Sequence, residues 1–186
     1  MLWKPYDSHR ILDDFGRNVE AKTKQFDEIG VRRIVTPCAG CYRTLKLDYP
    51  KYGGRKIEVL HMPELLARGL EEGTVNFSNL FNVMLTYHDR CHIGRHVGIY
   101  EQPRRVLRNV SNLELVEMKS NREYARCCGA GGSVLSGFPE ISRSLSRVRM
   151  IETKETRADI LATTCPFCNL NFRESAPPGL KILDLT

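Results

Sequence analysis

Seven cysteines are the residues of this sequence with the clearest capacity for chemistry. Four of them form two C-x2-C pairs, and two others are adjacent. Their positions are Cys38, Cys41, Cys91, Cys127, Cys128, Cys165 and Cys168. Because the number is odd and the cytosol keeps thiols reduced, a disulfide framework explains them poorly. Cysteines grouped in this way are typical of metal ligands or redox groups.

Five of these cysteines form one spaced set. Between Cys91 and Cys127 lie 35 residues, and 36 separate Cys128 from the pair Cys165 and Cys168. Adjacent cysteines point to opposite sides of an extended chain, so they suit a ligand set that surrounds a multinuclear centre. Glycines follow Cys128, and their backbone can approach closely and offer N–H groups to sulfur. Soft thiolates of this kind favour iron–sulfur clusters, zinc or Cu(I).

Histidines and arginines accompany the first cysteine of the set. His88 and His92 are weaker candidates for catalysis, as donors to a cluster sulfur or a product thiolate, and the alternative is an ordinary loop role. A basic stretch could hold a sulfonate, phosphate or carboxylate, or dock an acidic electron carrier. It comprises Arg90, Arg95, Arg104, Arg105 and Arg108, the last two of which could equally form a solvated helix face.

Helices and strands must position these side chains. The apolar pattern and its Gly and Pro boundaries predict helices over 8–28 and from 63, 103 and 139. It predicts strands over 31–36, 57–60, 82–87, 113–118, 158–163 and 182–185. This alternation indicates an α/β fold with a mainly parallel sheet flanked by helices. The cysteines then lie in loops at the carboxyl ends of strands, where such sheets hold ligands.

The helix from residue 139 has a simple predicted orientation. Its apolar residues recur at helical spacing and predict one stripe that faces the core. They are Ile141, Leu145, Val148 and Ile151.

An internal repeat relates the two C-x2-C pairs. A shift of 127 residues places Cys38 on Cys165 and Cys41 on Cys168. We therefore expect residues 1–78 to be the end of a first repeat with its linker, and 79–186 to be a nearly complete second repeat. Cys38 and Cys41 then form a weaker second metal site, and the two C-x2-C loops are expected at separate places.

Three segments carry a resemblance to a known family. TYHDRCHIGR, CCGAGGS and TTCPFCNLNF resemble the cysteine-rich CCG domain found in the B and D subunits of heterodisulfide reductase. The iron–sulfur subunits of glycolate oxidase and anaerobic glycerol-3-phosphate dehydrogenase contain the same domain. The resemblance implies a non-cubane four-iron, four-sulfur cluster. Its implied ligands are Cys91, Cys127, Cys128, Cys165 and Cys168. Arg90 stands where the family usually has proline.

The function implied is an iron–sulfur oxidoreductase subunit. It would take electrons from a flavoprotein, ferredoxin or membrane cytochrome and carry them to a disulfide, in which case an anionic disulfide is a candidate substrate. One alternative is a structural or interaction module stabilised by zinc. Another is a dithiol oxidoreductase that uses a C-x2-C pair. It is disfavoured because such a thiol needs a helix N-terminus and no thioredoxin-like pattern is present.

Composition and charge limit the class of protein to which the sequence can belong. The chain has 186 residues and a formal charge of +6, with 41% hydrophobic residues, so a packed core is expected. No apolar run reaches the ~18 residues of a membrane span, and no secretory signal is recognisable. A cytoplasmic protein, peripheral to a membrane through a partner subunit, is therefore expected. Nucleic-acid binding is disfavoured because the single tryptophan is Trp3 and no basic aromatic sheet is indicated.

Overall fold

The computed structural model describes residues 8–54, 56–78 and 82–185. The helices are α1 (Ser8–Glu28), α2 (Ala39–Arg43), α3 (Met62–Glu71), α4 (Glu101–Arg108), α5 (Val134–Gly137), α6 (Pro139–Glu155) and α7 (Pro166–Ser175). The strands are β1 (Arg33–Thr36), β2 (Glu58–His61), β3 (Val83–Tyr87), β4 (Leu113–Leu115), β5 (Ile160–Thr163) and β6 (Lys181–Asp184). Each expected strand is present, with shifts of a few residues at its ends. Trp3 lies outside the described residues, as do residues 79–81, which directly follow the expected domain boundary between 78 and 79.

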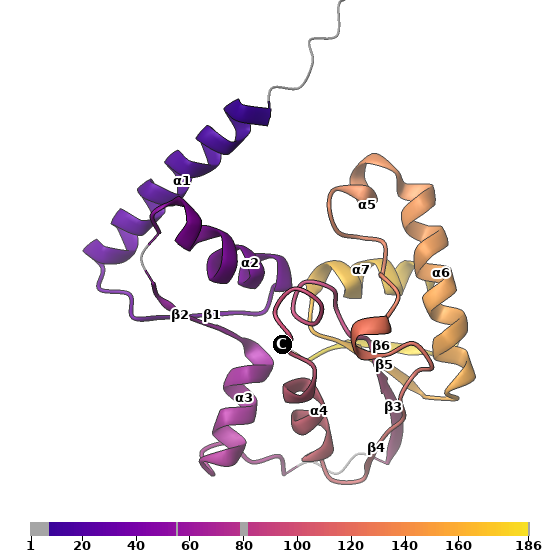
Figure 1. The fold of residues 1–186 in the computed structure, drawn as a ribbon. Helices are drawn as coiled ribbons and strands as arrows, with labels where there is room; N and C mark the ends of the chain where they lie inside the picture. Colours follow the sequence, from indigo (N-terminus) through magenta and orange to yellow (C-terminus); the bar gives the residue numbers. More distant parts are fainter. Residues whose placement is uncertain (1–7, 55, 79–81, 186) are drawn as a thin grey trace, which may run out of the picture.

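The strands form two sheets. One pairs β1 with β2, and the other has the order β4-β3-β5-β6. Every pairing among the described strands is parallel, which confirms the predicted α/β class. Strand β5 is buried along its whole length, as a central parallel strand must be when both faces are covered. Figure 1 shows the small sheet with α1 and α2 on one side of the molecule, and the larger sheet with α5, α6 and α7 on the other.

The repeat is visible in the order of elements. β1 and β5 coincide under the shift of 127 residues, and each is followed by a cysteine, a helix and a parallel strand. The expectation that both C-x2-C pairs lie in loops is wrong for Cys41 and Cys168, because α2 begins directly after Cys38 and α7 directly after Cys165. Pro166 explains the second start, since proline at the first helical position has the right φ and no N–H to leave unpaired.

The prediction that the apolar stripe of α6 faces the core is wrong. Ile141 is 55% exposed and Ile151 is 62% exposed, and Leu145 and Val148 are also exposed. The buried face is mostly polar, with Ser142, Ser146, Arg149, Met150 and Thr153. Two of its polar groups bond to neighbouring segments: the Ser146 hydroxyl donates to the Asn171 carbonyl at 3.2 Å, and the Arg149 guanidinium donates to the Ser120 carbonyl at 2.7 Å.

Cysteines belong to the core beneath α6 and α7. Cys128, Cys165 and Cys168 pack with Leu161 and Phe172 in one buried cluster. Thiols are well suited to such a core, because an unligated cysteine behaves as a small hydrophobic group. Among the described residues, no helix has the length and the hydrophobicity needed to cross a membrane.

Candidate metal centre

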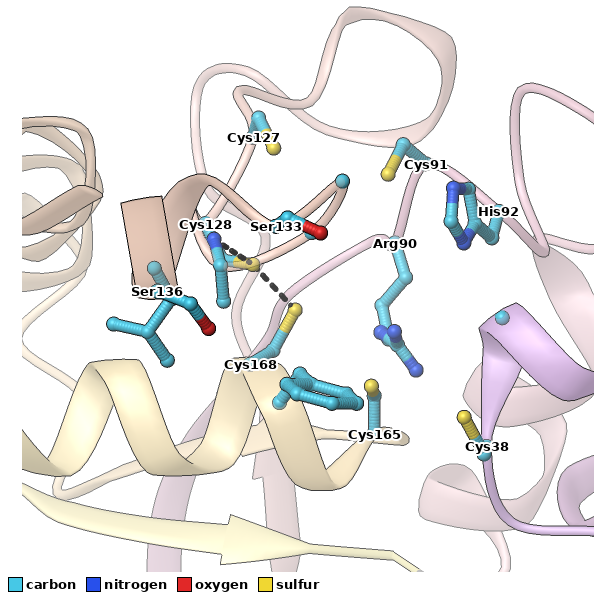
Figure 2. A pocket seen from close by; sticks show the side chains of 16 residues that line it. Cys38, Arg90, Cys91, His92, Cys127, Cys128, Ser133, Ser136, Cys165 and Cys168 are labelled. Atoms are coloured by element: carbon cyan, nitrogen blue, oxygen red, sulfur yellow. Dashed lines mark hydrogen bonds between the residues drawn. The ribbon is translucent and has the colours of Figure 1, made fainter. Parts of the chain in front are cut away.

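Six cysteines line one cavity of about 320 Å³. They are Cys38, Cys91, Cys127, Cys128, Cys165 and Cys168. Three of them, Cys38, Cys91 and Cys165, follow the carboxyl ends of strands β1, β3 and β5, where parallel strands of α/β folds hold ligands. Figure 2 shows Cys91 and Cys127 on one side of this cavity and Cys38 facing Cys165 on another.

The most buried sulfurs form a close pair. The Sγ atoms of Cys168 and Cys128 are 2.7 Å apart. The neighbouring Cys127 raises the pKa of Cys128 to about 12, and burial raises the pKa of Cys168 to about 12. Both thiols therefore keep their protons near neutral pH when no metal is bound, and metal binding must release them.

Cys127 is the most acidic thiol of the set. Hydrogen bonds from the thiols of Cys128 and Cys91 lower its pKa strongly, and Cys91 has a raised pKa in return. The Gly129 N–H also donates to the Cys127 sulfur at 3.3 Å, and the Ala130 N–H donates to the Cys128 sulfur at 3.5 Å. The predicted backbone donors of the glycine-rich segment are thus present.

A glycine and an asparagine hold the Cys-Cys turn in place. Gly129 has a φ of +86°, and a Cβ at this position would lie 2.6 Å from the Ser142 carbonyl oxygen. The Asn171 amide donates to the Cys128 carbonyl at 2.6 Å. The turn is therefore fixed against α6 by a close approach that only glycine allows, and against α7 by a side-chain hydrogen bond.

The second C-x2-C pair lies at a helix start. Cys165 is the N-cap of α7, and Cys168 is in its first turn. A helix N-terminus, one requirement of a dithiol oxidoreductase, is therefore present at this pair. Yet the pKa of Cys165 is raised, chiefly by its interaction with Cys168, although a helix N-terminus alone would lower it. The feature that defines a dithiol oxidoreductase, a low-pKa attacking thiol, is not found at Cys165.

Cys38 departs from the expected arrangement. Its thiol interacts with Cys165, and this interaction is the largest cause that raises the pKa of Cys38 to about 12. The expectation of C-x2-C loops at separate places is therefore wrong for Cys38. Equivalent residues of the repeat meet because β1 and β5 both end at the same cavity. Cys41 is exposed and does not line the cavity, so the two cysteines of the first pair have different environments.

His88 lies beside the buried sulfurs. One of its ring nitrogens is within 4.8 Å of the sulfurs of Cys128 and Cys168. The Arg149 Nε–H donates to His88 Nδ1 at 3.1 Å. Burial, and then the charge of Arg149, lower the pKa of His88 well below its ordinary value. The ring is therefore neutral, with its proton on Nε2.

His92 occupies a more open position. It lines the cavity beside Cys91 and is half-buried, with its ring centroid 5.1 Å from that of His96. Burial, and then His96, lower the pKa of His92.

The basic stretch does not form one surface. Arg104 is fully buried and bonds to Asp89 and Glu117, so it cannot dock a partner. Arg90 is 5% exposed and lines the cavity. Arg95, Arg105 and Arg108 remain on the surface.

Three supporting residues were not predicted from the sequence. Asp89 anchors the loop before Cys91, Arg149 orients His88, and Asn171 holds the Cys-Cys turn. Asp89 could have been noticed from its place beside the cysteine loop. Arg149 lies on α6, which was predicted, and Asn171 lies on α7, which was not. A polar residue on a helix is usually interpreted as solvent-exposed.

Known proteins are similar to this chain over most of its length. The family model for the cysteine-rich domain named CCG matches residues 10–46 and 85–173. The D subunit of dihydromethanophenazine:CoB–CoM heterodisulfide reductase from Methanosarcina barkeri is 38% identical over 170 residues, which cover 88% of this chain and 41% of that protein.

Two further relatives have other names. The B subunit of fumarate reductase (CoM/CoB) from Methanothermobacter marburgensis is 40% identical over 146 residues, covering 78% of this chain and 28% of that protein. EtfAB:quinone oxidoreductase of Syntrophomonas wolfei is 35% identical over 158 residues, covering 81% and 22%. The chain thus spans less than half the length of each of these relatives.

Proposed function

Since the chain belongs to the cysteine-rich CCG domain family, we propose that it is an iron–sulfur redox unit that passes electrons to a disulfide or a related acceptor. The observation that carries the proposal is the convergence of five spaced cysteine sulfurs in one cavity. The proposed ligands are Cys91, Cys127, Cys128, Cys165 and Cys168, with Cys38 at the same cavity and Cys41 outside it.

The donor set fits a multinuclear cluster better than a single ion. A structural zinc takes four ligands in a tetrahedron, and this cavity offers more sulfurs than that. Soft sulfur donors and backbone N–H groups aimed at sulfur are typical of iron–sulfur sites. The donor set therefore supports an iron–sulfur cluster, and the resemblance to the heterodisulfide reductase subunits leads us to propose one with four irons and four sulfurs of the non-cubane kind.

The zinc alternative has one observation in its favour. His88, Cys128 and Cys168 lie close enough together to hold a single ion. However, Nδ1 of His88 accepts the hydrogen bond from Arg149 and Nε2 carries the ring proton, so neither ring nitrogen is free for an ion in this arrangement. A structural zinc site would also need a fourth ligand from the same cavity.

The chain's own residues define how an acceptor could approach. When bound, the cluster would supply single electrons, and a disulfide that accepts two electrons and two protons yields two thiols. Phe167 and Leu135 provide apolar lining of the cavity, where the carbon chain of a disulfide could pack. His88 and His92 lie close to the sulfurs as hydrogen-bonding groups. A flavoprotein, ferredoxin or membrane cytochrome is the proposed electron donor.

Metal analysis of anaerobically purified protein tests the cluster. Iron and acid-labile sulfide should be present in comparable amounts, with a brown colour and a paramagnetic resonance signal in one oxidation state. Stoichiometric zinc without sulfide, in protein from a host that assembles clusters, would contradict the proposal and support the zinc module.

A second measurement tests the acceptor. Protein reduced with dithionite and freed of excess reductant should be reoxidised by an anionic disulfide with release of thiol. Ferricyanide serves as the control oxidant. Reoxidation by ferricyanide without any thiol release from the disulfide would show a cluster that only transfers electrons.

A further inference from the structure

Among the described residues, Arg90 is a buried cation without a carboxylate partner. Arg104 and Arg149 are also buried, but Arg104 bonds to Asp89 and Glu117, and Arg149 bonds to Glu152. Arg90 is 5% exposed, and the part of the chain that the structure describes places no carboxylate within ion-pair distance of it. Its Nη1 donates to the Thr164 carbonyl, and its Nε bonds to none of the residues described. A buried charge left in this state is strongly unfavourable unless an anion faces it.

The surroundings of the guanidinium limit what that anion can be. Tyr87 faces Arg90 but is a neutral phenol, because burial raises its pKa. His61 is close enough for the charge of Arg90 to add to the effect of burial, and together they lower the pKa of His61 to about 4. His61 is therefore uncharged at neutral pH. The groups that remain are the sulfurs of Cys165 and Cys168, which interact most strongly with Arg90.

The position of Arg90 links the two sides of the cavity. Its backbone precedes Cys91, and its side chain bonds to the carbonyl of Thr164, which precedes Cys165. Figure 2 shows the guanidinium extending between Cys168 and Cys165 on one side and Cys38 on the other. One cation thus contacts the loop that follows β3 and the loop that follows β5, at the place where thiolate charge would gather.

We propose that Arg90 is the counter-ion of the cysteine-bound cluster and raises its reduction potential. This inference rests on the proposed function. Each thiolate ligand brings a negative charge, and reduction of the cluster adds another. A fixed, buried cation stabilises the reduced form more than the oxidised form. The protein thereby tunes the centre with a side chain that is not itself a ligand.

A redox titration followed by paramagnetic resonance tests Arg90. Arg90→Gln should lower the ratio of reduced to oxidised cluster about tenfold at the wild-type midpoint, which is a shift of about 59 mV to more negative potential for one electron. Arg90→Lys keeps the charge and should restore most of the ratio. Arg173→Gln removes an equal charge from the exposed part of α7, the helix that carries Cys168, and should change the ratio little, because solvent screens it.

The outcomes separate the inference from the proposed function. A wild-type potential in Arg90→Gln, with full iron and sulfide, would overturn the inference and leave the cluster proposal intact. If Arg90→Gln does not retain iron, Arg90→Lys decides: recovered iron at a near wild-type potential supports the charge role, and continued loss overturns it in favour of a purely structural link to Thr164. Wild-type protein without iron and sulfide would refute the proposed function itself, and the inference with it.

Discussion

The buried guanidinium of Arg104 donates to both carboxylate oxygens of Asp89, with both distances at 2.7 Å. The same carboxylate accepts the Arg122 backbone N–H at 2.7 Å. Asp89 directly precedes the Arg90-Cys91 segment, so α4 and the loop before Cys91 are joined by this pair. The pair therefore connects the stability of the fold to the placement of the first proposed ligand.

Removal of one partner should destabilise the protein. Arg104→Met leaves Asp89 buried and unpaired, and the free energy of unfolding should fall by about 3–5 kcal/mol. Arg105→Met on the same helix is the matched control. Arg105 is exposed and paired with Glu71 at the surface, so its loss should lower the unfolding free energy by less than about 1 kcal/mol. Anaerobic urea unfolding followed by circular dichroism measures both, and equal midpoints would contradict the argument.

The cysteines should fall into three classes when each is replaced by serine. Cys128→Ser should lose most of the iron, because an alkoxide is a poor substitute for a buried soft thiolate. Cys38→Ser should keep the iron but alter the resonance signal, since Cys38 interacts with Cys165. Cys41→Ser should behave as wild type, because that thiol is exposed and outside the cavity.

Iron counts and spectra of the three variants decide this classification. A Cys38→Ser signal identical to that of Cys41→Ser would show that the first C-x2-C pair has no influence on the centre. Loss of iron in Cys41→Ser would instead point to a metal site outside the described cavity.

Much of this arrangement could be predicted from the sequence because it depends on local patterns. Strands β1 and β5 have the same length and place in the repeat, and Cys91 and Cys165 follow β3 and β5, which pair in parallel and so end at one edge of their sheet. The resemblance of short motifs also placed the five spaced cysteines together. These features need only the order of residues and the direction of the strands.

Other features depend on contacts that no local pattern contains. The apolar residues of α6 form a helical stripe, but periodicity cannot say which face of a helix is packed, and here Arg149 lies inside because His88 and Glu152 receive its hydrogen bonds. The meeting of Cys38 with Cys165 depends on how the two sheets are placed relative to each other. A shift of 127 residues shows that they are equivalent, but not that they face each other.

In metal-free protein, alkylation should distinguish buried thiols from the exposed one. With a pKa of about 12, Cys128 and Cys168 have roughly one thiolate in ten thousand at pH 8, and burial hinders the reagent further. Iodoacetamide should therefore modify Cys41 before Cys128 and Cys168, and modification of this buried pair should rise about tenfold for each pH unit. Peptide mass spectrometry over time gives the rates. Equal rates at Cys128 and Cys41 would show that the cavity opens without metal.

Two glycines of one loop provide a test of the Cys-Cys turn. Gly129 and Gly132 both have positive φ, at +86° and +63°, so alanine is strained by about 1–2 kcal/mol at either. They differ in space: a Cβ on Gly132 meets nothing within 4 Å, whereas one on Gly129 would lie 2.6 Å from the Ser142 carbonyl. Gly129→Ala must therefore also displace the turn from α6, which adds about 1–3 kcal/mol of destabilisation.

The Gly129→Ala substitution should also move the N–H that bonds the Cys127 sulfur, so iron content should fall in Gly129→Ala and stay at the wild-type level in Gly132→Ala. Unfolding free energies and iron per chain, measured on both variants together, check this. Equal iron loss in the two would mean that backbone strain, not the close approach to α6, governs the turn.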